Sequence, residues 1–73
     1  MNADELFEKL GYNKTSLKEA NWIVYTHEIE GIEITFDLKD NQICCSDTYD
    51  MAIFFDSDDL NAINLKCKEL GWI

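Results

Sequence analysis

The strongest constraint on the fold is the alternation of apolar and polar side chains along residues 32–38. This period of two predicts a β-strand with one buried face and one exposed face. Residues 22–29 are rich in β-branched and aromatic side chains and predict a second strand. A two-residue turn at residues 30–31 would pair the two strands with Tyr25 opposite Phe36. The apolar side chains of both strands would then lie on the same face of the sheet.

The sheet is predicted to continue beyond this hairpin. A second turn at residues 40–41, an Asp-Asn pair suited to left-handed backbone, would add a third strand through Cys45. Cys45 would then lie inside and Cys44 outside, because neighbouring side chains of a strand point to opposite faces. Residues 51–55 predict a short fourth strand, and the polar residues 13–21 predict a loop.

Two segments with helical periodicity flank this centre. Residues 3–10 and 57–70 each begin after a capping-box sequence and end in a Leu-Gly-aromatic sequence. Asn2 and Asp56 are the expected N-caps. Each helix carries one apolar stripe, which needs a surface to cover. The expected buried side chains are Ala3, Leu6, Phe7 and Leu10 in the first helix and Leu60, Ile63, Cys67 and Leu70 in the last.

The 73 residues therefore predict one small acidic α+β domain, residues 1–73. The predicted element order is α-β-β-β-(β)-α, an antiparallel meander in which residues 51–55 form the bracketed strand. Each helix has one apolar stripe and the sheet has one apolar face, so we expect both helices on the same face of the sheet. The opposite face would then be open to solvent.

The net charge of −9 comes entirely from the middle of the chain. Residues 28–59 hold ten of the 15 carboxylates and a single base, Lys39, whereas acids and lysines balance in the rest. The chain has no arginine, and its lysines are too scattered to hold a phosphate backbone. This composition disfavours direct binding to nucleic acid or to an anionic membrane and favours a basic protein surface as the partner.

No residue pattern indicates catalysis, a metal site or a bound cofactor. His27 is the only imidazole, and we expect it to pack inside the sheet near Tyr25 without a nucleophile beside it. The three cysteines are odd in number, and Cys44 and Cys45 point to opposite faces, so no zinc site is predicted. Residues 56–61 depart from a calcium loop and fit a helix N-terminus. An acidic start in place of a secretory signal predicts reduced thiols and a cytoplasmic location.

The exposed sheet face and its turns form the predicted interaction surface. One hypothesis is that its carboxylates, spaced ~6.7 Å apart along a strand, imitate nucleic-acid phosphates and inhibit a basic nucleic-acid-binding protein. The alternative is that these acids only keep the protein soluble and protect the sheet edges. Trp22 and Val24 also fall on this face and predict a contact patch, which includes the possibility of a homodimer. The predicted interaction residues are Trp22, Val24, Glu28, Glu33, Asp37, Asp40, Asp47 and Asp50.

The opening sequence NADELFEKLGY (residues 2–12) and the closing sequences LNAI (60–63) and KELGW (68–72) carry a further signal. They resemble a group of short proteins without assigned activity from phages, prophages and other mobile elements of low-GC Gram-positive bacteria. The resemblance implies a cytoplasmic accessory protein, gives no catalytic residue to transfer, and favours an inhibitor of a host system. The leading prediction is a non-enzymatic accessory domain that binds protein, with nucleic-acid mimicry as the alternative.

Overall fold

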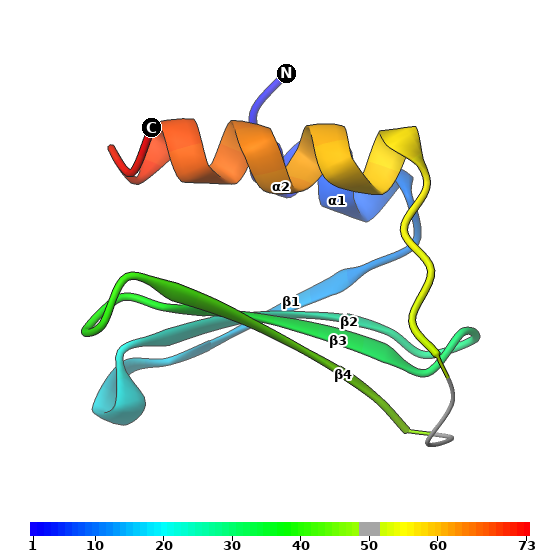
Figure 1. The fold of residues 1–73 in the computed structure, drawn as a ribbon, viewed down its shortest axis with the longest axis horizontal. Coiled ribbons are helices and arrows are strands. Elements are labelled where there is room, and N and C mark those ends of the chain that lie inside the picture. The colour runs from blue at the N-terminus through cyan, green and yellow to red at the C-terminus, as the bar shows by residue number, and fades with distance from the viewer. Residues whose placement is uncertain (49–51) are drawn as a thin grey trace.

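The chain folds in the order α-β-β-β-β-α, with both helices packed on one face of a four-stranded antiparallel sheet (Figure 1). The computed structural model describes residues 1–48 and 52–73. Each strand pairs with the next along the chain, so β1 and β4 are the edges of the described sheet. The predicted fold class is confirmed. The elements are α1 (Ala3–Lys9), β1 (Asn13–Leu17), a 3-10 turn (Lys18–Ala20), β2 (Trp22–His27), β3 (Ile32–Asp37), β4 (Gln42–Asp47) and α2 (Ser57–Glu69).

Both helices begin at the predicted capping boxes. The Asn2 side chain accepts a hydrogen bond from the Glu5 N–H (2.8 Å), and the Asn2 N–H donates to the Glu5 carboxylate (3.3 Å). Asp56 and Asp59 exchange the equivalent bonds at 2.9 and 3.2 Å. These bonds satisfy N–H groups that the start of a helix otherwise leaves unpaired, and they fix where each helix begins.

Both helices also end as predicted, through a glycine with positive φ. After α1, Gly11 has a φ of +98°, and the N–H of Tyr12 donates to the Phe7 carbonyl at 3.0 Å. After α2, Gly71 has a φ of +77°, and the next N–H donates to the carbonyl five residues earlier at 2.9 Å. This reversal satisfies free carbonyls at each helix end and turns the following aromatic residue back toward the helix.

Four-residue loops connect the strands at both places where the sequence predicted two-residue turns. The longer loop after β2 shifts the register by two residues, so that Tyr25 faces Ile34 instead of Phe36, and the β3–β4 pair shifts likewise. A shift of two leaves every side chain on its predicted face, because the side-chain period of a strand is also two. The last residue of each loop has left-handed backbone, and these residues are Asn21 (φ 57°), Gly31 (φ 69°) and Asn41 (φ 54°).

The side chain that ends a strand holds the loop that follows it. The Asp37 carboxylate accepts hydrogen bonds from the N–H groups of Lys39 (3.0 Å) and Asp40 (3.3 Å). At the end of β2, the Nδ1 of His27 accepts from the Glu30 N–H at 3.2 Å. A two-residue turn would have no room for such a cap, so these bonds explain why the loops are longer than predicted.

The fourth strand is not the predicted one, and it lies at the other edge of the sheet. Asn13–Leu17 forms β1 where the sequence predicted a loop, whereas residues 52–55 form no strand and residue 51 lies outside the described residues. The sequence of β1 lacks the apolar alternation that would have identified a strand, and every one of its side chains is exposed. Its extended backbone is stabilised by pairing with β2.

The core is centred on three aromatic rings. Phe7 of α1 stacks on Tyr25 of β2 with ring centroids 3.9 Å apart. Phe36 of β3 meets these two rings edge-on at 6.3 and 5.7 Å. Trp72, which follows α2, packs against Phe36 at 6.1 Å. One aromatic cluster therefore joins the first helix, the two central strands and the C-terminus.

The buried side of α2 differs from the prediction, because Leu60 is not part of it and Ala62 and Lys66 are. Leu60 was expected in the buried stripe but is 55% exposed. The buried residues of this helix are Ala62, Lys66 and Cys67. The helix is oriented so that Lys66 reaches Asp4 of α1, at 3.5 Å, and this orientation leaves Leu60 at the margin of the core.

We expect Gly11→Ala to destabilise the fold more than Gly71→Ala. Both positions have positive φ, which costs a non-glycine residue about 1–2 kcal/mol. A Cβ at Gly11 would also lie 2.8 Å from the Nε2 of His27, whereas a Cβ at Gly71 would meet nothing within 4 Å. The His27 ring is held by the Glu30 N–H and packs edge-on against Tyr12, so it cannot turn away freely. Urea unfolding measures both losses, and equal losses would contradict this explanation.

Candidate functional site

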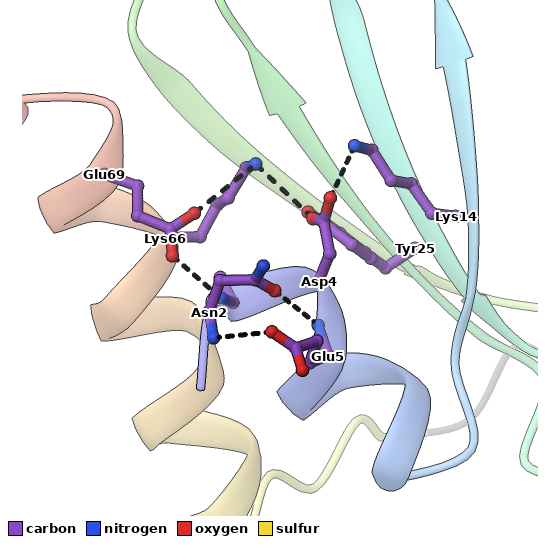
Figure 2. Close-up of polar contacts among 8 residues, drawn as sticks. Asn2, Asp4, Glu5, Lys14, Tyr25, Lys66 and Glu69 are labelled. Atoms are coloured by element: carbon purple, nitrogen blue, oxygen red, sulfur yellow. Dashed lines mark hydrogen bonds and ion pairs between the residues drawn. The ribbon is translucent and has the colours of Figure 1, made fainter.

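A cluster of charged side chains joins the two helices to the sheet (Figure 2). Asp4, in the first turn of α1, lies at its centre. The Asp4 carboxylate accepts hydrogen bonds from the Lys14 Nζ (2.7 Å) and from the Tyr25 hydroxyl (2.5 Å). The Nζ of Lys66 lies 3.5 Å from the same carboxylate. The carboxylate therefore contacts side chains from β1, β2 and α2.

Glu69 extends this cluster along α2. Its carboxylate accepts a hydrogen bond from the Ala3 N–H at 2.7 Å and lies 3.9 Å from the Lys66 Nζ. Lys66 is only 7% exposed, and a buried ammonium is tolerated only beside anionic partners. No buried side-chain nitrogen or oxygen in the described part of the chain lacks a hydrogen-bond partner. The cluster is thus satisfied internally.

The electrostatics of this cluster favour a structural role. Burial opposes ionisation of Asp4, but the hydrogen bonds from Lys14 and Tyr25 and the charge of Lys66 lower its pKa from 3.8 to about 2. Burial and, after it, the hydrogen bond to Asp4 raise the pKa of Tyr25 above its usual value. The carboxylate therefore stays ionised and the phenol stays protonated near neutral pH, so neither group is suited to proton transfer there.

The free energy of unfolding is expected to fall in acid through Asp4. Its folded-state pKa lies below the unfolded value of 3.8, so the stabilisation is present above that value and is lost as the pH falls toward about 2. Asp4→Asn should lower the free energy of unfolding near neutral pH and change it little near pH 2.

The matched control is Asp58→Asn, because Asp58 occupies the equivalent first-turn position in α2. Asp58 has no ion pair with a lysine among the described residues. Urea unfolding across the acidic range measures both variants. A loss for Asp4→Asn that does not change with pH would contradict the contribution of the charged contacts.

His27 is engaged in packing, as the sequence predicted, but the aromatic ring that it contacts is that of Tyr12 and not the predicted Tyr25. Its ring lies edge-on to the ring of Tyr12, with centroids 5.2 Å apart, and its Nδ1 accepts a hydrogen bond from the Glu30 N–H. The Tyr12 hydroxyl in turn donates to the Asp59 carboxylate at 3.2 Å. These contacts connect the end of β2 to the start of α2.

The strongest candidate for a binding site lies on the sheet face that the helices leave open. Strand pairing sets the side chains of this face in three rows of four across the sheet. Polar side chains make up half of the first two rows and all of the third. From β1 to β4, the rows are Leu17–Trp22–Asp37–Gln42, Thr15–Val24–Thr35–Cys44 and Asn13–Thr26–Glu33–Ser46.

A hollow of about 270 Å³ crosses this face from β2 to β4. Trp22, which is 41% exposed, lines one part of it. Glu33 and Asp37 also line it, from positions on either side of Thr35 along β3. The Asp37 side chain is oriented by the hydrogen bonds that its carboxylate accepts from N–H groups of the following loop. Asp37 is the cross-strand partner of Trp22, and an aromatic ring beside a carboxylate suits an organic cation.

The structure divides the predicted interaction residues among several places. Four of them belong to the open face, but Val24 is only 7% exposed and offers little contact area. Asp47 pairs with Ile32 and therefore belongs to the helix-covered face. The open-face residues are Trp22, Val24, Glu33 and Asp37; Glu28 and Asp40 lie in loops, and Asp50 lies outside the described residues.

Besides Ile43, which belongs to the helix-covered face, sequence reasoning missed four residues that line the hollow, namely Thr35, Gln42, Cys44 and Ser46. Their position on the open face was available from the alternation of side chains along each strand. These residues are uncharged, and a prediction based mainly on charge selected the acidic residues instead.

The thiols and acids of the described residues form no group that could hold a metal ion. Burial raises the pKa of both Cys45 and Cys67, which keeps these thiols protonated and weakly nucleophilic. Cys44 is exposed on the open face. The free thiols therefore give no indication of a reactive centre.

Comparisons with protein-family models, with curated proteins and with solved structures found no match. In the described part of the chain, no helix has the length and apolar character needed to cross a membrane. The resemblance of the chain ends to phage proteins stays a prediction. Function is therefore inferred from the open face itself.

Proposed function

We propose that this chain is a non-enzymatic accessory domain that binds a protein partner through its open sheet face. The observation that carries the proposal is the hollow in which Trp22 lies with the carboxylates of Glu33 and Asp37. A guanidinium group suits this hollow because it pairs with carboxylates and also packs on an aromatic ring. The partner is accordingly a protein with an exposed basic segment.

The overall charge of the chain supports the same partner. The net charge of −9 attracts a basic surface from a distance and raises the rate of encounter. Lys14 and Lys66, which would oppose this attraction, are paired with Asp4 on the other side of the sheet. The distributed charge favours approach, and the hollow supplies the specific contact.

Nucleic-acid mimicry, the alternative, receives less support from the geometry. A mimic needs a regular row of charges near the ~7 Å spacing of phosphates along a strand. On β3, Thr35 separates Glu33 from Asp37, so the Cα atoms of the two acids lie about 13 Å apart along an extended strand. Glu28 and Asp40 lie in loops at opposite ends of the sheet (Figure 1). This spacing fits separate basic side chains of one partner segment better than a continuous groove for nucleic acid.

The proposed setting is the cytoplasm, in a phage or another mobile element. The resemblance of the chain ends implies this setting, and exposed Cys44 is suited to a reducing compartment. In that setting the domain would inhibit or redirect a basic host protein without catalysing a reaction.

A short Arg-Gly peptide is the probe for this site. Titration into ¹⁵N-labelled protein should shift the resonances of Trp22 and Thr35 before those of the loops. Replacing Glu33 by Gln and Asp37 by Asn should weaken binding by about tenfold or more, because two charge-assisted contacts are lost. The control pair, Glu28→Gln with Asp40→Asn, removes the same charge outside the hollow and should weaken binding far less.

The two double variants separate the hypotheses. Equal weakening by both would show that attraction depends on total charge, which would contradict the discrete site and favour mimicry. Resonance shifts confined to the loops would also contradict the site. Added salt should weaken all binding, because the approach depends on screened charges.

A further inference from the structure

Most of the outer edge of β4 lacks the features that protect exposed strands, and its one charged side chain, Asp47, is at the end of the strand. Sheet edges are commonly blunted by lysine, proline or a bulge. The other edge, β1, carries Lys14, which is paired with Asp4. Residues 42–46 have neither a charge nor a proline, and no described strand pairs with their outer side. This edge is therefore available for a further strand.

A bond just beyond β4 shows which backbone groups point outward. The Thr48 N–H donates to the Gly31 carbonyl at 2.8 Å, so the backbone of residue 48 faces the β3 side. Backbone groups of successive residues in a strand point to alternate sides. Ile43 and Cys45 therefore direct their N–H and C=O groups away from the sheet. Two outward-facing residues in this spacing form a template for an antiparallel strand.

We propose that β4 pairs antiparallel with β4 of a second copy of this chain, which joins two four-stranded sheets into one about a twofold axis. Such an interface uses the same surface on both copies. Paired residues must share a sheet face, and hydrogen-bonded pairs must use the outward-facing residues. Both conditions hold when Cys44 faces Cys44 of the second copy and Ile43 faces Cys45 of the second copy.

Neighbouring registers fit less well. A two-residue shift in one direction sets the apolar Ile43 against Asp47, whereas a shift in the other direction leaves only residues 42–44 paired within β4. The chosen register pairs residues 42–46 and places no charged side chain opposite another within that stretch. This pairing allows association despite the net charge of −9 on each copy.

The flank of α2 supplies a second, apolar part of this surface. Counted from Lys66, which faces α1, Cys67 lies about 100° and Leu60 about 120° around the helix. Leu60 therefore lies beyond the sheet-facing residues, on the side away from α1 and toward β4. Both Leu60 and Ile43 are exposed in the single chain. A second copy at the β4 edge would cover these side chains, which accounts for the apolar residue that α2 leaves uncovered.

The native thiols test the register. The two Cys44 residues would form a non-hydrogen-bonded pair with Cα atoms about 4.5 Å apart, a separation that a disulfide can span. Diamide accepts the two hydrogens released when two thiols join, and it should convert the wild-type protein to a covalent dimer. Cys44→Ser should abolish this dimer, whereas Cys45→Ser and Cys67→Ser should not. A link through Cys45, or equal yields in native buffer and in urea, would overturn the register.

Sedimentation equilibrium tests the association itself. Wild-type protein should form a reversible dimer, and Ile43→Glu should raise its dissociation constant by about tenfold or more. Leu17→Glu is the matched control: it adds the same charge to the other edge strand, at a side chain of similar exposure (43% against 38%). Circular dichroism verifies that both variants fold.

A wild-type protein that stays monomeric at about millimolar concentration, or equal effects of the two substitutions, would overturn the dimer. Because no basic peptide is present in these experiments, their outcome is separate from that of the proposed function.

Discussion

Tyr25 makes the contact on which the rest of the structure depends. Its ring stacks on Phe7 at 3.9 Å, and its hydroxyl donates to Asp4 at 2.5 Å. One residue of β2 therefore holds α1 to the sheet by both an apolar and a charged contact, and Lys66 extends the charged contact to α2. With both helices held on this face, the opposite face is left open, and its hollow becomes available to a partner.

Much of the fold could be predicted because the relevant signals are local or periodic. Capping boxes at Asn2 and Asp56 fixed the helix starts, and alternation along β3 assigned side chains to faces. Loop length was predicted wrongly because the Glu30-Gly31 and Asp40-Asn41 pairs were taken as two-residue turns. The bond from the Lys39 N–H to Asp37 is an Asx turn, which an aspartate allows but does not require, and the bond to His27 has no such signature. β1 could not be predicted, because pairing rather than apolar alternation makes it a strand.

The candidate site was predicted less well than the fold. Counting charges identified an acidic centre, but among the predicted acids that the structure describes, only Glu33 and Asp37 belong to the open face. The cluster around Asp4 was missed because Lys66 is far from it in sequence. The available signal was that Lys66 interrupts the apolar stripe of α2, next to Cys67, where a charged residue needs a buried partner.

The most direct test is a nuclear Overhauser measurement on the free protein. If the helices cover the face that bears Tyr25, the Phe7 ring protons will show cross-peaks to the rings of Tyr25 and Phe36. Neither helix will show a cross-peak to Thr35, whose side chain belongs to the opposite face. Cross-peaks from α1 or α2 to Thr35, without contacts to Tyr25, would contradict the arrangement.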